Sequence, residues 1–167
     1  MRHFVLKPFR TSQTCLNLTA HGEGVLHVTD DVLLLAQAAV GTPDPYPPLF
    51  PAQQVRGYVL RDACRYAEFR VLSRGGNDDR ATLEVEVLHI GRLRDFFGFN
   101  RGRHAVLEAA ILATRTGLLS PESIEAEFAR LAPLVEKTGG GRERQAFAFL
   151  CRFLASEKRR QGEEESG

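Results

Sequence analysis

Cysteine, net charge and long apolar runs are all scarce in this sequence. The three cysteines, Cys15, Cys64 and Cys151, lie far apart, are odd in number and form no Cys-x-x-Cys pair. Such a set disfavours a disulfide framework or a zinc knuckle and is typical of a reducing compartment. Cys15 and Cys151 fall in apolar helical patterns, so we predict that both are small core residues.

The charges of the chain nearly cancel, with 22 Lys and Arg against 21 Asp and Glu and a formal net charge of +1. The basic residues are also spread along the chain, so binding to nucleic acid is not expected. No apolar run approaches the ~18 residues that a membrane span needs. The first residues, MRHFVLKPFR, are too polar for a signal peptide. We therefore expect a cytoplasmic protein without nucleic-acid or membrane partners.

Motifs for common nucleotide, metal and catalytic sites are also missing. Neither a Walker motif nor a GxGxxG occurs, which excludes a P-loop or Rossmann site. The histidines show no metal-type spacing, so no metal site is predicted. No Ser-His-Asp or Cys-His set is legible, and no catalytic residue is predicted.

The patterns that are present predict one α+β domain for a chain of 167 residues. Strands are predicted first, at 3–9, 24–29, 55–62, 66–74 and 80–90. Helices are predicted at 12–20, 31–40, 103–118, 121–136 and 142–158. Asp30 is the predicted N-cap of the second helix. The proline-rich segment 42–51 predicts a loop, and the charged segment 157–167 predicts a disordered tail.

A phosphate site is one interpretation of the segment between a predicted strand and the helix near residue 12. A helix start offers unpaired N–H groups and a positive dipole end. Side chains add a guanidinium, hydroxyls and an amide there, from Arg10, Thr11, Ser12, Thr14 and Asn17. The alternative is a simple N-cap at Thr11 or Ser12, which needs no ligand.

A second polar set lies on the helix that begins near residue 101. Arg101, His104, Glu108 and Arg115 fall in one narrow sector of a helix that is otherwise almost wholly apolar. The stripe is therefore predicted to be largely buried and to need partners. It indicates either a structural ion-pair network or a site in which Asn100 and Arg101 face an anion from the helix start.

Four blocks of the sequence together resemble the domain-of-unknown-function family 447. The blocks are LKPFRTSQTCLNL, GEGVLHVTDDV, GFNRGRHAVLEAAILATR and VEKTGG. The resemblance extends from about Phe4 to Phe153, with the proline-rich loop unaligned. Members of the family begin with an extra strand that carries an Asn-x-Ala-Pro-x-Gly-like segment expected to contact the flavin, and this sequence begins after that segment.

The resemblance implies an antiparallel, six-stranded split β-barrel that binds FMN, with a C-terminal helical segment. Its relatives are flavin reductases and pyridoxamine-phosphate oxidases. It also implies a homodimer with its cofactor sites at the interface. We expect the FMN-binding core at 1–100, packed helices at 101–156 and the tail at 157–167. The expected cofactor-binding residues are Arg10, Thr11, Ser12, Thr14, Asn17, Thr29, Asp30, Asn100 and Arg101.

Two segments then have both a structural and a ligand interpretation. Thr29-Asp30-Asp31 predicts a helix cap, or hydrogen bonds to the ring or ribityl groups of the flavin. Lys137-Thr138-Gly139 predicts a helix end closed by glycine, or a Lys that reaches an anion.

The function that follows is that of a flavoprotein oxidoreductase, with NAD(P)H or another small redox substrate as its partner. One alternative is a non-enzymatic protein that binds a flavin or another phosphate ligand. A second alternative is a structural dimer without a cofactor, because fold does not fix function.

Overall fold

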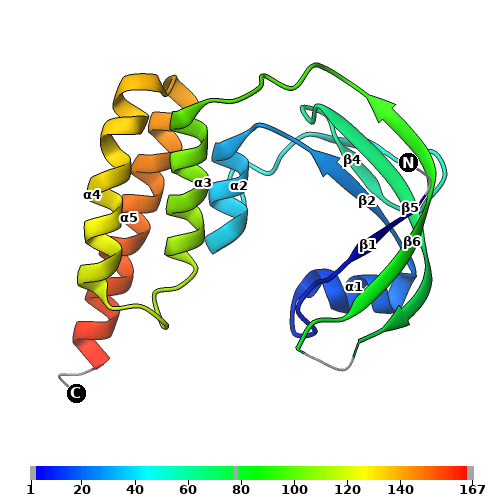
Figure 1. Ribbon diagram of the computed structural model, residues 1–167, viewed down its shortest axis with the longest axis horizontal. Coiled ribbons are helices and arrows are strands. Elements are labelled where there is room, and N and C mark those ends of the chain that lie inside the picture. Colours follow the sequence, from blue (N-terminus) through cyan, green and yellow to red (C-terminus); the bar gives the residue numbers. More distant parts are fainter. Residues whose placement is uncertain (1–2, 77–78, 165–167) are drawn as a thin grey trace. The chain divides into compact units, whose positions relative to one another are not determined.

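The computed structural model describes residues 3–76 and 79–164. The chain divides into two compact units (Figure 1). The barrel unit comprises Met1–Thr29 and Pro48–Phe96, and the helical unit comprises Asp30–Pro47 and Phe97–Gly167. Strands and helices both contribute, so the predicted α+β class is confirmed.

The barrel unit is built on a four-stranded antiparallel sheet of order β1-β6-β5-β2. Its strands are β1 (His3–Leu6), β2 (Glu23–Val28), β5 (Arg65–Gly75) and β6 (Thr82–Arg92). Helix α1 (Gln13–His21) contributes to the same core. That core consists of Cys15, Leu18, Phe69, Ala81, Leu83 and Val85. Alternation along β5 and β6 predicted this hairpin, and residues 77–78 of its turn lie outside the described residues.

A second, two-stranded sheet replaces the strand predicted at 55–62. It pairs β3 (Leu49–Pro51) with β4 (Tyr58–Leu60), so the end of the proline-rich segment is a strand instead of a loop. The fully buried carboxylate of Glu68 accepts backbone hydrogen bonds from Gln53 and Gln54. These bonds fix the intervening residues as a loop, which shortens the predicted strand.

The helical unit contains α2 (Val32–Val40), α3 (Arg101–Ala113), α4 (Pro121–Thr138) and α5 (Gly141–Glu164). Its buried core residues are Val32, Leu33, Ala36, Ala105, Val106, Ala109, Ala110, Ala113, Ile124, Phe128, Val135, Ala146 and Leu150. Ser120 caps α4 and Pro121 occupies its first turn, as predicted. In the part of the chain that the structure describes, no helix is both long and apolar enough to cross a membrane.

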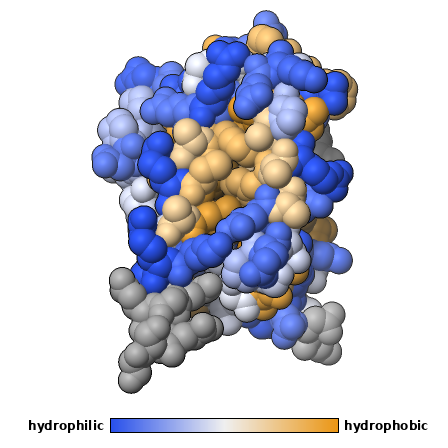
Figure 2. Space-filling model, turned by 90° about the vertical axis from the view of Figure 1, so that its left-hand side faces the viewer, coloured by the Kyte–Doolittle hydropathy of each residue, from blue (hydrophilic) through white to orange (hydrophobic). Residues whose placement is uncertain are grey.

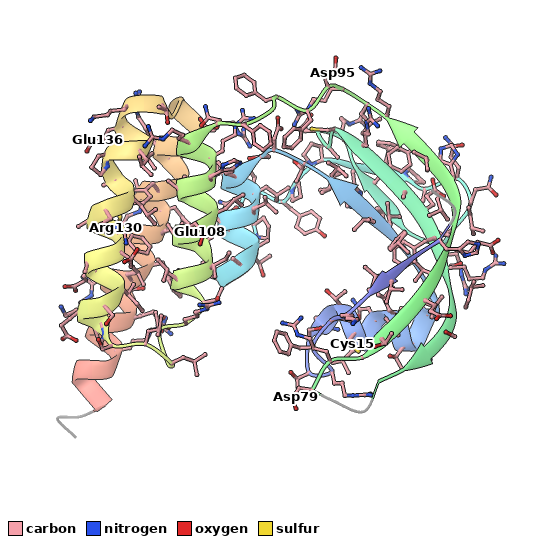
Figure 3. All side chains as sticks on the ribbon, viewed as in Figure 1. Cys15, Asp79, Asp95, Glu108, Arg130 and Glu136 are labelled. Atoms are coloured by element: carbon pink, nitrogen blue, oxygen red, sulfur yellow. The ribbon has the colours of Figure 1, made fainter. Side chains whose placement is uncertain are left out.

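The polar stripe on α3 is exposed, so the prediction that it is buried was wrong. Arg101, His104, Glu108 and Arg115 are all exposed, and Figure 3 labels Glu108 on α3. The face that α3 buries carries its small residues instead, namely Gly102, Ala105, Val106, Ala109, Ala110 and Ala113. Small side chains allow neighbouring helices to approach closely, and the long polar ones then remain on the outer face.

Three further predictions about the helical unit need correction. Cys151 is exposed on α5 and is not a core residue. Helix α5 continues to Glu164, so the expected disorder is wrong for 157–164, and residues 165–167 lie outside the described residues. Helix α2 belongs to the helical unit, although residues 1–100 were expected to form the flavin-binding core.

A histidine connects the two sheets of the barrel unit. The Nε2 atom of His27 on β2 accepts a hydrogen bond from the backbone N–H of Leu60 on β4, at 3.0 Å. Burial lowers the pKa of His27 below its ordinary value. Both observations favour the neutral imidazole, since a protonated ring has no acceptor to offer.

We predict that the stability of the barrel unit falls as the pH drops below about 6.5, the ordinary histidine pKa. With its folded pKa lowered, His27 binds more protons in the unfolded chain, so stability is complete above that pH and declines below it. Urea unfolding between pH 7.5 and 5 measures the effect. His27→Gln should flatten the dependence of the unfolding free energy on pH. His3→Gln, which changes a histidine on β1, is the control and should leave that dependence unchanged. An unaltered profile in His27→Gln contradicts the prediction.

Candidate functional site

The start of α1 contains the five residues predicted to bind a phosphate. Ser12 is the N-cap, and its Oγ accepts a hydrogen bond from the Cys15 N–H at 3.2 Å. The same hydroxyl donates to the Phe9 carbonyl at 2.7 Å. The cap interpretation is therefore confirmed for Ser12, and its hydroxyl proton is already committed within the chain.

The turn before α1 is held against the end of the β5–β6 hairpin. The Arg10 N–H donates to the Asp79 carbonyl at 2.9 Å, and its guanidinium donates to the Gly76 carbonyl. Arg80 lies over the Phe9 ring, 3.7 Å from its centroid. Figure 3 labels Asp79 beside this end of the hairpin and Cys15 on α1. Arg10, in this turn, and Arg80, at the end of the hairpin, thus place two guanidinium groups just before α1.

The remaining predicted residues of this segment are exposed. Thr11 and Thr14 present hydroxyl groups on the surface. Asn17 is also exposed, and its Oδ1 accepts from Gln13 Nε2 at 2.8 Å. Guanidinium, hydroxyl and first-turn N–H groups are the donors that phosphate oxygens accept from. This arrangement, which we call the α1 anchor (residues 10–17), has the chemistry to bind a phosphate.

The charge of the barrel unit also suits an anion. Its two chain segments contain 11 Lys and Arg against 8 Asp and Glu. The helical unit has 11 against 13. A net positive unit raises the local concentration of an anionic ligand, although the effect weakens with salt.

Asn100, at the start of α3, has a structural role. Its Oδ1 accepts from the Arg103 N–H at 2.9 Å, and its Nδ2 donates to the Thr138 carbonyl at 3.1 Å. Next to it, an added Cβ on Gly102 would lie 2.8 Å from the backbone nitrogen of Gly139. Two blocks of the sequence, GFNRGRH and VEKTGG, therefore meet where α3 begins and α4 ends.

The segment Lys137-Thr138-Gly139 forms the end of α4, closed by glycine, as its structural interpretation predicted. Gly139 is the C-cap, and its N–H donates to the Val135 carbonyl at 2.8 Å. Lys137, in the last turn, is exposed. A cation at this position is favourable beside the negative end of the helix dipole.

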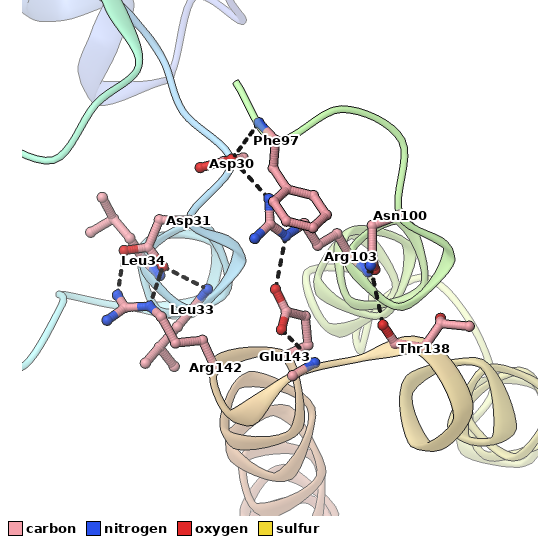
Figure 4. A network of polar contacts seen from close by, with 11 residues as sticks. Asp30, Asp31, Leu33, Leu34, Phe97, Asn100, Arg103, Thr138, Arg142 and Glu143 are labelled. Atoms are coloured by element: carbon pink, nitrogen blue, oxygen red, sulfur yellow. Dashed lines mark hydrogen bonds and ion pairs between the residues drawn. The ribbon is translucent and has the colours of Figure 1, made fainter. Parts of the chain in front are cut away.

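Arg103 is the centre of a buried ion-pair network in the helical unit (Figure 4). Its Nη1 lies 2.8 Å from Asp30 Oδ2, and its Nε lies 2.8 Å from Glu143 Oε1. Both carboxylates are buried. Asp30 Oδ2 also accepts from the Phe97 N–H at 3.0 Å, and the Phe97 ring lies over the guanidinium.

Asp30 is therefore part of this network and is not the cap of α2. The cap is Asp31, whose Oδ1 accepts from the N–H groups of Leu33 and Leu34, each at 3.2 Å. Asp31 also pairs with Arg142, at the start of α5. Thr29, the last residue of the barrel unit, is half-buried directly after β2.

The two partners of Arg103 explain the pKa shifts in the network. Burial alone would raise the pKa of Glu143, but hydrogen bonds from Arg103 and from backbone N–H groups, including that of Gly140, hold it below its ordinary value. Burial would lower the pKa of Arg103, and the two carboxylates outweigh that effect and raise it. The charged forms of both groups are therefore favoured.

Neither Arg103 nor Glu143 was predicted from the sequence as a functional residue. The Gly140 N–H donates to Glu143 Oε2 at 2.8 Å. This glutamate reaching back at a helix start resembles a capping box, a pattern that is visible in sequence. For Arg103 no comparable local signal exists, because its partners lie 73 and 40 residues away.

The nine predicted site residues divide between the two units. Arg10, Thr11, Ser12, Thr14 and Asn17 come together in the α1 anchor, and Thr29 ends the same unit. Asp30, Asn100 and Arg101 belong to the helical unit. Within residues 3–76 and 79–164, no three His, Cys, Asp or Glu side chains are grouped so that they could hold a metal ion.

Comparison with known proteins identifies first the fold and then the family. The chain has the antiparallel split-barrel fold with a helical segment. A family described as "Protein of unknown function (DUF447) N-terminal domain" matches residues 2–94, and "Protein of unknown function (DUF447)" matches residues 100–152. The chain belongs to this family.

An FMN-bound protein of the same family from Methanosarcina mazei is similar in structure. The TM-score is 0.77 at 22% identity, over 89% of this chain and 80% of that protein. The NADH:FAD oxidoreductase SgcE6 of Streptomyces globisporus has a TM-score of 0.47 at 12% identity, over 54% of this chain and 58% of that one. The flavin reductase HpaC has a TM-score of 0.47 at 15% identity, over 57% of this chain and 62% of that one. No curated protein matches the chain.

We predict that Arg103→Ala destabilises the protein by about 3 kcal/mol, because it leaves two buried carboxylates without their cation. Urea unfolding at pH 7 measures the loss. Arg142→Ala is the matched control. Arg142 is exposed and its partner Asp31 keeps two backbone hydrogen bonds without it, so this ion pair should contribute no more than about 1 kcal/mol. If the two variants lose the same free energy of unfolding, the burial of its carboxylate partners does not explain the contribution of Arg103 to stability.

Proposed function

We propose that this protein binds FMN and that the α1 anchor holds the phosphate of the flavin. The observation that carries the proposal is the exposed set of phosphate donors at the start of α1. It occurs in a chain whose fold resembles that of an FMN-bound member of its own family. The positive charge of the barrel unit supports the same ligand.

The donors of the α1 anchor fit a phosphate in different ways. Arg10 supplies a charged guanidinium, one nitrogen of which already donates to Gly76, and Thr11 and Thr14 supply hydroxyls that are exposed. Asn17, also exposed, adds an amide group. Ser12 contributes by fixing the turn, because its hydroxyl already donates to Phe9.

The predicted contacts outside the anchor differ in their exposure and in the unit to which they belong. Asp30 and Asn100 make the hydrogen bonds of the helical unit described above, so their main role is to hold that unit together. Arg101 is exposed and Thr29 is half-buried. Thr29, which lies in the same unit as the α1 anchor, remains a proposed further contact to the flavin, and the contacts expected of Asp30, Asn100 and Arg101 in the helical unit stay predictions.

Bound FMN would supply redox chemistry, namely hydride and electron transfer between a donor such as NADH or NADPH and an acceptor. In this part of the proposal the protein is a reductase-like oxidoreductase. The chain's own contribution is to bind the phosphate, to orient the flavin and to shape access to it.

We also propose that the protein is a homodimer in the cytoplasm, with its cofactor sites at the interface. An apolar cross-strand row supports the dimer, because Leu26 on β2 and Ile90 on β6 both lie opposite Ala67 on β5. Leu26 is 40% exposed and Ile90 is 57% exposed. Light scattering of the native protein gives its mass, and a monomer at micromolar concentration contradicts this part of the proposal.

We predict that the full chain binds FMN more tightly than riboflavin, which lacks the phosphate. Arg10→Ala and Thr14→Ala should each reduce that preference about tenfold, since a charge-assisted hydrogen bond contributes roughly 1.5–3 kcal/mol. Titration that follows flavin fluorescence measures both affinities. Riboflavin affinity should stay within about twofold, which separates lost phosphate contacts from misfolding.

Thr19→Ala is the matched control, because Thr19 is an exposed threonine near the other end of the same helix. It should leave both affinities unchanged. If Arg10→Ala and Thr14→Ala preserve the preference for FMN, the phosphate does not bind at the α1 anchor. Bleaching of bound FMN by NADH or NADPH under anaerobic conditions tests the oxidoreductase part. FMN that binds but is never reduced favours a non-enzymatic flavin binder.

A further inference from the structure

The helical unit contains an apolar cavity whose lining includes no residue of the α1 anchor or of the Arg103 network. It lies between the first half of α4 and the second half of α5, and has a volume of about 280 Å³. Its walls include Ile124 and Phe128 from α4, and Cys151 and Leu154 from α5. We call it the α4–α5 pocket. Its volume is near the lower end of the range for small-molecule sites.

The surroundings of the pocket are apolar and electrically neutral. Figure 2 shows apolar side chains gathered on the side of the unit formed by α4 and α5, with hydrophilic side chains around them. At the rim, Lys158 Nζ lies 2.7 Å from Glu125 Oε1, and Glu157 pairs with Arg160. Each charged group at the rim thus has its counter-charge within the chain.

Cys151 does not add charge to the wall. Although the residue is exposed, neighbouring side chains partly desolvate its thiol and raise the pKa above the ordinary value, so the group is protonated at neutral pH. The charged residues of the lining, Glu125, Glu157 and Lys158, are each in an ion pair within the chain, so the lining offers a ligand no charge that lacks a counter-charge. A charged ligand would lose its hydration without gaining a partner, which disfavours it.

We propose that the α4–α5 pocket binds a small, uncharged, predominantly apolar molecule. The concave form and the limited volume favour a small molecule over a protein surface, because small-molecule sites are concave and mostly apolar. The pairing of the rim charges within the chain favours a neutral occupant. This site is separate from the α1 anchor, so the proposal does not depend on FMN binding.

The test uses N-phenyl-1-naphthylamine, an uncharged apolar dye whose fluorescence increases away from water, with the full chain. We expect saturable binding that Ala155→Phe weakens at least tenfold, because Ala155 lines the pocket and a phenyl ring would fill it. Ala126→Phe is the matched control. Ala126 is exposed on the same helix as Phe128 and does not line the pocket. The control should bind the dye within twofold of the unmodified protein, and circular dichroism verifies that both variants are folded.

A second measurement needs no variant. Cys151 is exposed, whereas Cys15 and Cys64 are buried, so a maleimide should modify Cys151 first. Saturating dye should slow this modification at least fivefold. Unchanged modification, non-saturable binding, or full binding by Ala155→Phe overturns the proposal. Protection of Cys151 that increases with protein concentration in the absence of dye also overturns it, because a second copy of the chain would then cover the pocket.

Discussion

The helical unit depends on one arginine that compensates two buried carboxylates. Removing two carboxylates from water is costly, and only a cation with several directed donors can offset that cost inside a protein. Arg103 does so with separate nitrogens for Asp30 and Glu143. Three elements meet at this side chain, since Asp30 precedes α2, Arg103 lies on α3 and Glu143 on α5.

The same network fixes where the chain enters the helical unit. The units are divided between Thr29 and Asp30 and again between Phe96 and Phe97. Asp30 and Phe97, the first residues on the helical side, are joined through one carboxylate oxygen that also binds Arg103. Hydrogen bonds and an ion pair within the helical unit thus hold these two entry points.

Elements with strong local patterns could be predicted from the sequence, and those set by distant contacts could not. Strand alternation predicted β5 and β6, and Ser120 with Pro121 predicted the start of α4. Asp30 and Asp31 are equally good caps by type, and only Arg103, 73 residues from Asp30, decides between them. The sequence correctly grouped the polar residues of the stripe on one face of the helix, but that face is exposed instead of buried. The apolar character of the rest of the helix misled the prediction, because Ile111 and other large apolar residues also occupy exposed positions. The cap of α1 was predicted from residue types, whereas the bond from Arg10 to Gly76 spans 66 residues and has no local signal.

The order of the two units along the chain has a consequence for biosynthesis. Helix α2 is made before most of the barrel unit. Its cap, Asp31, pairs with Arg142, which is made 111 residues later. At the usual rate of synthesis, that interval lasts on the order of ten seconds. During this time the apolar sequence VLLLAQAAV has emerged without the helices that later bury it. The nascent protein therefore passes through a stage in which α2 is open to chaperones and to aggregation.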